Sequence, residues 1–125
     1  MGRYEDFQAF RARLNERILQ PPEGKAPATL VTKRFFNLDA KAYESGALPE
    51  RTKEMLGLAA SAVLRCDDCI AYHIDRCVEL GVSDEELLEV LDVALIVGGS
   101  IVIPHLRRGV DFLDACRDAR KAQGT

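Results

Sequence analysis

The chain has 125 residues and a formal net charge of −3 at pH 7, with 47% hydrophobic and 30% charged residues. This length fits one globular domain that can bury an ordinary core, and the composition is not that of a disordered chain. The small negative charge gives no basis for binding nucleic acid or an anionic membrane, and no apolar run is long enough to span a bilayer.

The first 28 residues predict one helix followed by an extended arm. Residues 4–19 carry apolar side chains at three- and four-residue spacing, as in an amphipathic helix: Phe7, Phe10, Leu14 and Ile18. Residues 20–28 contain three of the five prolines, which predicts a loop or an extended arm after this helix.

The next two segments differ in how clearly they predict a helix. Residues 29–43 show no clear period, so we expect one turn of helix, capped at Asn37 or Asp39, and an irregular stretch. Pro49 suits the first position of a new helix. From Glu50 onward, one face of that helix is apolar: Met55, Leu56, Ala59, Ala62 and Val63.

The second half of the chain predicts three further helices. The first begins near Asp67 and ends at Gly81, and the second opens with a capping box formed by Ser83 and Glu86. This second helix is apolar almost all round over residues 87–97, which predicts burial in the core or by a second subunit. A glycine pair separates it from the last helix, where Pro104 is tolerable only near the first turn. No β alternation is convincing, so the predicted fold is all-α, a single-domain helical bundle.

Two cysteines and a histidine form the most chemically suggestive motif of the chain. Cys66 and Cys69 are separated by two aspartates, and His73 follows four residues after Cys69. A helix advances about 100° per residue, so these three side chains lie on one face. Cys69 and His73, at i and i+4, can share a proton directly or through one water. The spacing therefore predicts thiol redox chemistry, with the imidazole as a base.

The expected compartment agrees with this chemistry. The N-terminus shows no apolar export segment, so we expect a cytoplasmic protein. In a reducing cytoplasm a close cysteine pair is more often catalytic or metal-binding than structural. A thiolate is favoured by the N-terminal end of a helix, but Asp67 and Asp68 oppose that effect, and the sequence does not decide between them.

Glu54 is a further candidate for the site. It lies twelve residues before Cys66, about 18 Å away along a straight helix. A contact with His73 therefore requires the chain to turn between Val63 and Asp68. Folded back in this way, Glu54 could orient His73 and receive its proton, as the third member of a nucleophile, base and orienting group.

The pattern Glu54-x11-Cys66-x2-Cys69-x3-His73 resembles the active-site signature of alkylhydroperoxidase D-like proteins, in the carboxymuconolactone decarboxylase superfamily. The resemblance covers residues 35–115, between an N-terminal helix and Pro-rich arm in residues 1–34 and a C-terminal tail in residues 116–125. It implies an all-helical subunit that assembles into trimers or hexamers. One position departs from the peroxidases of this family: Asp68 stands where they carry a histidine.

The resemblance also implies the activity and the partners. The cysteine pair would reduce a hydroperoxide or exchange a disulfide, and an external dithiol would reduce it again. Glu54, Cys66, Cys69 and His73 would form the proton relay and the redox pair, without a cofactor or a bound metal. We expect Cys69 to attack the peroxide and Cys66 to complete the disulfide, an order that rests on the closeness of Cys69 to His73.

Several alternatives stay open. The cysteines could be buried small hydrophobes, or they could bind zinc together with His73 and Glu54. Cys77 continues the series, but about 16 Å of helix separates it from Cys66. The protein could also be a decarboxylase-like lyase in which the cysteines are incidental, or a redox sensor without enzymatic activity.

Three other residues receive structural predictions. Cys77 and Cys116 are expected in the core. His105 follows Pro104 near a helix start, where it could border the pocket or an interface, and a structural role is the simpler reading.

Overall fold

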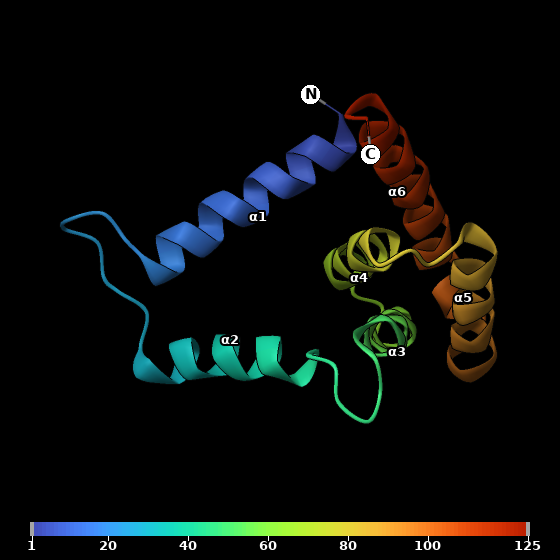
Figure 1. Cartoon of the computed structure of the whole chain (residues 1–125), viewed down its shortest axis with the longest axis horizontal. Coiled ribbons are helices and arrows are strands. Elements are labelled where there is room, and N and C mark those ends of the chain that lie inside the picture. Colours follow the sequence, from blue (N-terminus) through green and yellow to red (C-terminus); the bar gives the residue numbers. More distant parts are fainter. Residues whose placement is uncertain (1, 125) are drawn as a thin grey trace. The chain divides into compact units, whose positions relative to one another are not determined.

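The computed structural model describes residues 2–124, and within that range it contains helices joined by loops and no β-strand. The helices, shown in Figure 1, are α1 (Arg3–Leu19), α2 (Leu30–Ala42), α3 (Glu50–Val63), α4 (Asp67–Glu79), α5 (Asp84–Gly98) and α6 (Ile103–Ala122). One 3₁₀ turn, Ser100–Val102, precedes α6. The prediction of an all-α fold is confirmed.

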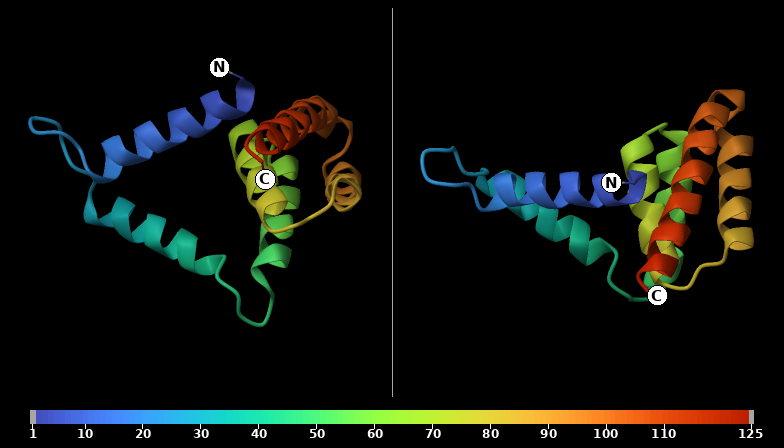
Figure 2. Two further views of the ribbon diagram at one scale, coloured as in Figure 1. Left: turned by 45° about the horizontal axis from the view of Figure 1, so that its top comes forward. Right: turned by 90° about the horizontal axis from the view of Figure 1, so that it is seen from above.

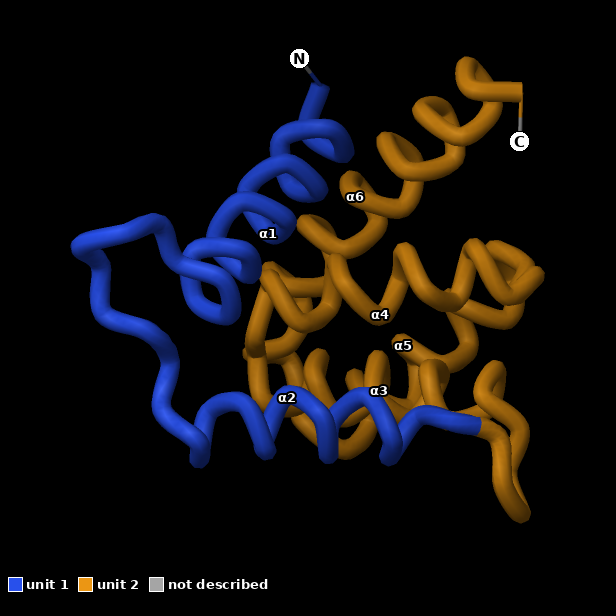
Figure 3. Tube along the Cα trace, turned by 60° about the vertical axis from the view of Figure 1, so that its left-hand side comes forward, with its two compact units in different colours: residues 1–44 blue, residues 45–125 orange. Residues whose placement is uncertain are grey.

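The chain divides into two compact units, residues 1–44 and 45–125 (Figure 3). The first unit holds α1, α2 and the proline-rich loop between them. This loop is tied to the end of α1 by two hydrogen bonds: the Ala28 N–H donates to the Ile18 carbonyl at 3.2 Å, and the Arg17 guanidinium donates to the Ala26 carbonyl at 3.1 Å. The predicted helix and loop in this region are confirmed.

Helix α2 differs from the prediction of a single turn and an irregular stretch, which was wrong. A full helix forms over Leu30–Ala42, and Asn37 lies inside it instead of capping it. The cap is Thr29, whose Oγ1 accepts the Thr32 N–H at 3.3 Å. No residue of α2 is buried in the structure.

The second unit is a helical bundle in which α3 packs against α4 and α5, and α4 packs against α6 (Figures 1 and 2). Its largest fully buried side chains come from all four helices and the turns between them: Leu58, Ile70, Ile74, Leu87, Leu91, Val82, Val102 and Phe112. Cys77 and Cys116 are fully buried among them, as predicted.

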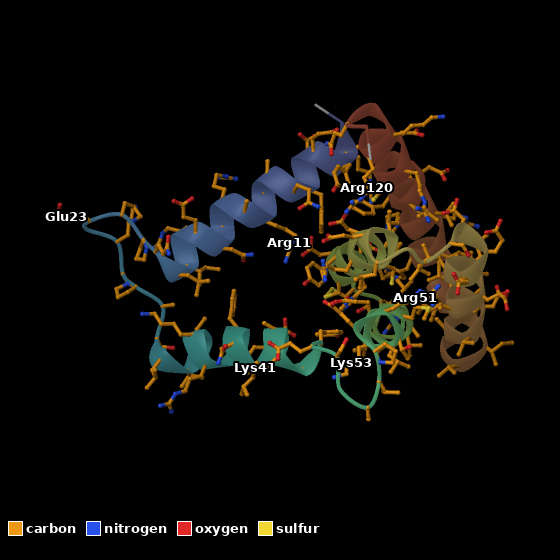
Figure 4. All side chains as sticks on the ribbon, in the orientation of Figure 1. Arg11, Glu23, Lys41, Arg51, Lys53 and Arg120 are labelled. Carbon is orange, nitrogen blue, oxygen red and sulfur yellow. A yellow bond between two sulfur atoms is a disulfide. The ribbon has the colours of Figure 1, made fainter. Side chains whose placement is uncertain are left out.

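Ion pairs add to the apolar packing between these helices. Arg120 on α6 donates to Asp75 on α4 at 2.8 Å, and Asp75 is buried. Arg51 on α3 reaches both carboxylate oxygens of Glu86 on α5 at 2.6 Å. Both arginines are labelled in Figure 4.

Glu86 also completes the predicted capping box of α5, which is confirmed. Its backbone N–H donates to the Ser83 hydroxyl at 3.1 Å, and its carboxylate accepts the Ser83 N–H at 3.0 Å. The helix ends at Gly98, and Gly99 follows with a φ of 84°, a conformation that favours glycine. Pro104 lies at the start of α6, where its missing N–H costs no helical hydrogen bond.

The apolar character of α5 exceeds what one subunit buries. Leu87, Leu91 and Ala94 face the core. Val90 and Leu95 are half-buried, and four other large apolar side chains are exposed: Leu88, Val93, Ile96 and Val97. The predicted burial of α5 is therefore met on one face only, and burial of the other by a second subunit stays a prediction.

The Glu86 contacts predict a pH-dependent contribution to stability. The hydrogen bond from Arg51, followed by those from Ser83, lowers the pKa of Glu86 from 4.5 to about 2. Because the folded pKa lies below the unfolded one, this contribution is present above about pH 4.5 and is lost as the pH falls toward 2. We expect Glu86→Gln to lower the urea midpoint at pH 6, and the difference from the parent to vanish near pH 2. Glu89→Gln, on an exposed position of the same helix, is the control. A midpoint difference that stays constant from pH 6 to pH 2 would contradict the assignment.

Candidate active site

A tight turn between α3 and α4 brings the candidate residues together. The Arg65 N–H donates to the Ala62 carbonyl at 3.0 Å, and the Cys66 N–H donates to the Ser61 carbonyl at 3.1 Å. These two bonds form a Schellman motif, which normally has glycine at the position that Arg65 occupies here with a φ of 61°. The chain turns between Val63 and Asp68, as the sequence analysis required, and α3 packs against α4.

Cys66 and Cys69 lie at the start of α4 and are joined by a disulfide, with their Cα atoms 5.3 Å apart. Cys66 is the N-cap residue, and its sulfur accepts the N–H of Cys69 at 3.3 Å. Cys69 is exposed, whereas Cys66 is half-buried. Cys69 is therefore the more exposed residue of the pair, and Cys66 is the one whose sulfur a backbone N–H stabilises.

Glu54 and His73 meet across the α3–α4 contact. The Glu54 Oε1 atom lies 2.7 Å from His73 Nδ1, and the two residues are 1% and 8% exposed. An ionised carboxylate can only accept, so Nδ1 carries the hydrogen of this bond. In the neutral imidazole the lone pair is then on Nε2, which is the atom able to take a proton.

Arg76 is a member of this site that the sequence analysis missed. Its Nε lies 3.7 Å from Glu54 Oε2, and its Nη2 lies 2.7 Å from Glu50 Oε2. A buried carboxylate is costly without partners, and Glu54 has one on each oxygen. The signal was available, because Arg76 follows His73 by three residues and so lies on the same face of α4.

The four predicted residues form two pairs in the structure. One pair is the Cys66–Cys69 disulfide, and the other is the Glu54–His73 hydrogen bond. They share α4, where His73 lies one turn beyond Cys69. A sulfur at the surface, backed by an imidazole whose tautomer a buried carboxylate fixes, is suited to proton-coupled thiol chemistry.

The other two cysteines, Cys77 and Cys116, lie in a different environment from Cys66 and Cys69. Burial raises the pKa of the Cys77 thiol to about 12 and that of Cys116 to about 11, so neither is a reactive thiolate at neutral pH.

Among residues 2–124, no group of three His, Cys, Asp or Glu side chains is arranged to hold a metal ion. Over the same residues, no helix is both long and apolar enough to cross a membrane.

A family model described as the carboxymuconolactone decarboxylase family matches residues 29–111, which are most of the chain. The chain belongs to the carboxymuconolactone decarboxylase family. This confirms the resemblance that the motif of Glu54, the cysteine pair and His73 indicated. The matched range runs from the cap of α2 to the middle of α6, so it contains every residue of the candidate site.

Solved structures of this family have the same fold. A carboxymuconolactone decarboxylase family protein of Thermotoga maritima, described as "possibly involved in antioxidative response", is 55% identical over 96% of this chain and 97% of its own, with a TM-score of 0.84. An apo carboxymuconolactone decarboxylase family protein of Legionella pneumophila is 24% identical over 90% of this chain and 96% of its own, with a TM-score of 0.73. Uncharacterized protein 4 in the cox locus of Paracoccus denitrificans is 28% identical over 64% of this chain and 72% of its own length.

Arg76 generates a prediction about stability. Arg76→Gln removes the cation beside Glu54 and leaves that buried carboxylate with His73 alone. We expect this variant to lose about 1–2 kcal/mol of unfolding free energy. Arg107→Gln, which removes the same charge from an exposed position, is the control. Equal urea midpoints for the two variants would show that Arg76 does not support Glu54.

Proposed function

We propose that this protein is a thiol-dependent hydroperoxide reductase or disulfide oxidoreductase that serves an antioxidant role in the cytoplasm. The observation that carries the proposal is the position of the Cys66–Cys69 disulfide, one helical turn before a histidine that a buried glutamate holds. The antioxidative response named for the Thermotoga maritima relative supports the same role. Glu54, Cys66, Cys69 and His73 are the proposed working residues.

The first step oxidises Cys69. His73 accepts the Cys69 proton on Nε2, and Glu54 stabilises the imidazolium through Nδ1–H. The thiolate attacks the terminal oxygen of the hydroperoxide, the O–O bond breaks, and the alkoxide takes the proton from His73 to leave as an alcohol. Cys69 is then a sulfenic acid. The exposure of Cys69 supports its role as the attacking sulfur, since a hydroperoxide must reach it.

The second step forms the disulfide that the structure contains. The Cys66 thiol loses its proton and its sulfur attacks the Cys69 sulfur, the S–O bond breaks, and the departing hydroxide takes up that proton and leaves as water. The two cysteines are three residues apart with Cα atoms at 5.3 Å, so this step needs no movement of separate helices.

An external dithiol then reduces the pair. One of its thiolates attacks the exposed sulfur of Cys69, and Cys66 leaves as a thiolate. The N–H of Cys69, which already points to the Cys66 sulfur, stabilises that leaving group. The second thiol of the reductant then attacks the mixed disulfide and releases Cys69 as a thiolate. The reductant leaves in its oxidised form, as a disulfide.

Two alternatives make different predictions. A lyase with incidental cysteines would keep its activity in Cys69→Ser. A redox sensor without turnover would change its size on gel filtration between the reduced and oxidised forms, while consuming negligible peroxide.

A thiol titration tests the proposed cycle. The reduced protein has four cysteines, and a slight excess of cumene hydroperoxide should remove two thiols per subunit. Cys66→Ser should lose one thiol and give a sulfenic acid at position 69 that dimedone traps, and Cys69→Ser should lose none. Cys77→Ala, at a buried site, is the control and should still lose two. No loss in the parent protein, with either peroxide or a small disulfide, would remove the redox proposal.

We further propose that the protein is a homo-oligomer, as the trimers or hexamers of the resemblance imply. The exposed face of α5 supports this: Ile96 is 87% and Val97 is 69% exposed on a helix with a long apolar run. Large apolar patches at the surface of a single subunit commonly mark interfaces, and a second copy of the chain offers a matching patch.

The oligomer proposal predicts the effect of a charge on α5. Ile96→Glu should lower the molar mass measured by light scattering after gel filtration from that of a trimer or larger assembly toward that of one subunit. Ala122→Glu adds the same charge to an exposed position of α6 and should leave the mass unchanged. A monomeric mass for the unmodified protein would contradict the proposal.

A further inference from the structure

Asp67, the residue after Cys66 in the redox motif, is held by two side chains of α6. His105 Nδ1 lies 2.7 Å from Asp67 Oδ1, and Arg108 Nε donates to Asp67 Oδ2 at 2.7 Å. The first turns of α6 thus contact the N-terminal end of α4 through both oxygens of one carboxylate. From the sequence, Asp67 was expected to oppose a nearby thiolate, and His105 was expected to border the pocket or an interface or, more simply, to have a structural role.

The hydrogen positions in this cluster follow from the contacts. Asp67 accepts at 2.7 Å, so His105 Nδ1 is the donor, and its 3.3 Å approach to Arg108 Nη2 joins two donors and is not a hydrogen bond. Burial opposes ionisation of Asp67, but the hydrogen bonds from His105 and Arg108 outweigh it and hold the pKa of this carboxyl below its usual value. Asp67 is therefore charged and compensated at neutral pH.

A glycine lets α6 approach α4 closely at this point. Gly109 is buried, and a Cβ atom there would lie 3.2 Å from Cγ2 of Ile70. Ile70 directly follows Cys69 on α4. Gly109 directly follows Arg108, so this close approach brings Arg108 within hydrogen-bonding distance of Asp67. The contact is part of the packing of α4 and α6 and does not depend on a flexible surface loop.

We propose that His105 and Arg108 compensate the charge of Asp67 and thereby allow Cys66 to carry a negative charge of its own. They act as positioning residues for the redox pair. This inference rests on the proposed function, in which Cys66 leaves as a thiolate when the disulfide is reduced.

A Cys66 thiolate and the Asp67 carboxylate are two negative charges on adjacent residues, and they repel each other. The Cys66 sulfur is stabilised by the N–H of Cys69 and by the end of α4, whereas a bare carboxylate at Asp67 would oppose that charge. A guanidinium that binds the carboxylate reduces its repulsion of the thiolate. The sequence left undecided whether the helix end, which favours a thiolate, outweighs the aspartates, which oppose it. For Asp67, the ion pair with Arg108 removes much of that opposition.

The test measures ionisation of Cys66 directly. In a Cys69→Ser background the amide that donates to Cys66 is retained, because it belongs to the backbone. The rate of iodoacetamide modification of Cys66, followed by mass spectrometry from pH 5 to 10, gives the thiol pKa. Cys77 and Cys116 are buried and ionise only near pH 12 and 11, so they do not interfere.

Opposite substitutions in the cluster should shift this pKa in opposite directions. Arg108→Gln should raise the pKa of Cys66 by about half a unit or more, and Asp67→Asn should lower it by a similar amount. The double variant should return close to the parent value. Arg107→Gln, the same charge change at the exposed neighbouring position, should have little effect. A concentrated salt solution should shrink the shifts.

Two results would overturn the inference. If Asp67→Asn and Arg108→Gln shift the pKa of Cys66 in the same direction, or if Arg108→Gln matches Arg107→Gln, the cluster has only a structural role. Because alkylation requires no peroxide and no reductant, the outcome is separate from the proposed function. A protein without peroxide turnover could still show the opposed shifts, and an active one could fail to show them.

Discussion

The hydrogen bond between Glu54 and His73 is the interaction on which the rest of the site depends. Glu54 is 1% exposed, and a carboxylate so deeply buried is tolerated only with partners on its oxygens. His73 and Arg76, both on α4, supply those partners from one face of the helix. The pair therefore joins α3 to α4 and, at the same time, fixes the tautomer of the imidazole, with Nε2 as the atom able to take a proton.

Charge compensation recurs along α4 and links its two ends. In its last turn, Arg76 offsets the buried Glu54, and at its N-terminal end Arg108 offsets Asp67. Both contacts join α4 to a neighbouring helix, α3 in the first case and α6 in the second. The redox pair thus lies beside the ion-paired contact at Asp67, in a position where small changes of charge act on a thiolate across few ångströms.

The sequence predicted most helix boundaries of the second unit because they are encoded locally. The Ser83–Glu86 capping box and the glycines that end helices each act within a few residues. The turn that returns Glu54 to His73 was required by the argument but not visible, since Arg65 adopts a conformation that normally indicates glycine. Helix α2 was missed, although its cap at Thr29 was a local signal in the sequence.

In the candidate site, too, the sequence predicted local spacing but not the contacts between helices. The spacing of Cys69 and His73 within one helix could be read from the sequence, whereas Cys66, predicted on the same helix face, is the N-cap residue and lies before the first residue of α4. The partners of Asp67 could not, since His105 and Arg108 are some forty residues away and meet it only through the packing of α6 on α4. Contacts within a helix follow from its period, whereas contacts between helices depend on the tertiary fold.

A double-mutant cycle on the buried pair tests the central claim most directly. In a Cys66→Ser background, single-turnover formation of sulfenic acid at Cys69 with cumene hydroperoxide can be timed by dimedone trapping. If Glu54 acts through His73, then Glu54→Gln and His73→Gln should each slow the reaction by about ten- to a hundredfold, and the double variant should be no slower than His73→Gln alone. Multiplicative effects of the two substitutions, or an unchanged rate in Glu54→Gln, would contradict the account.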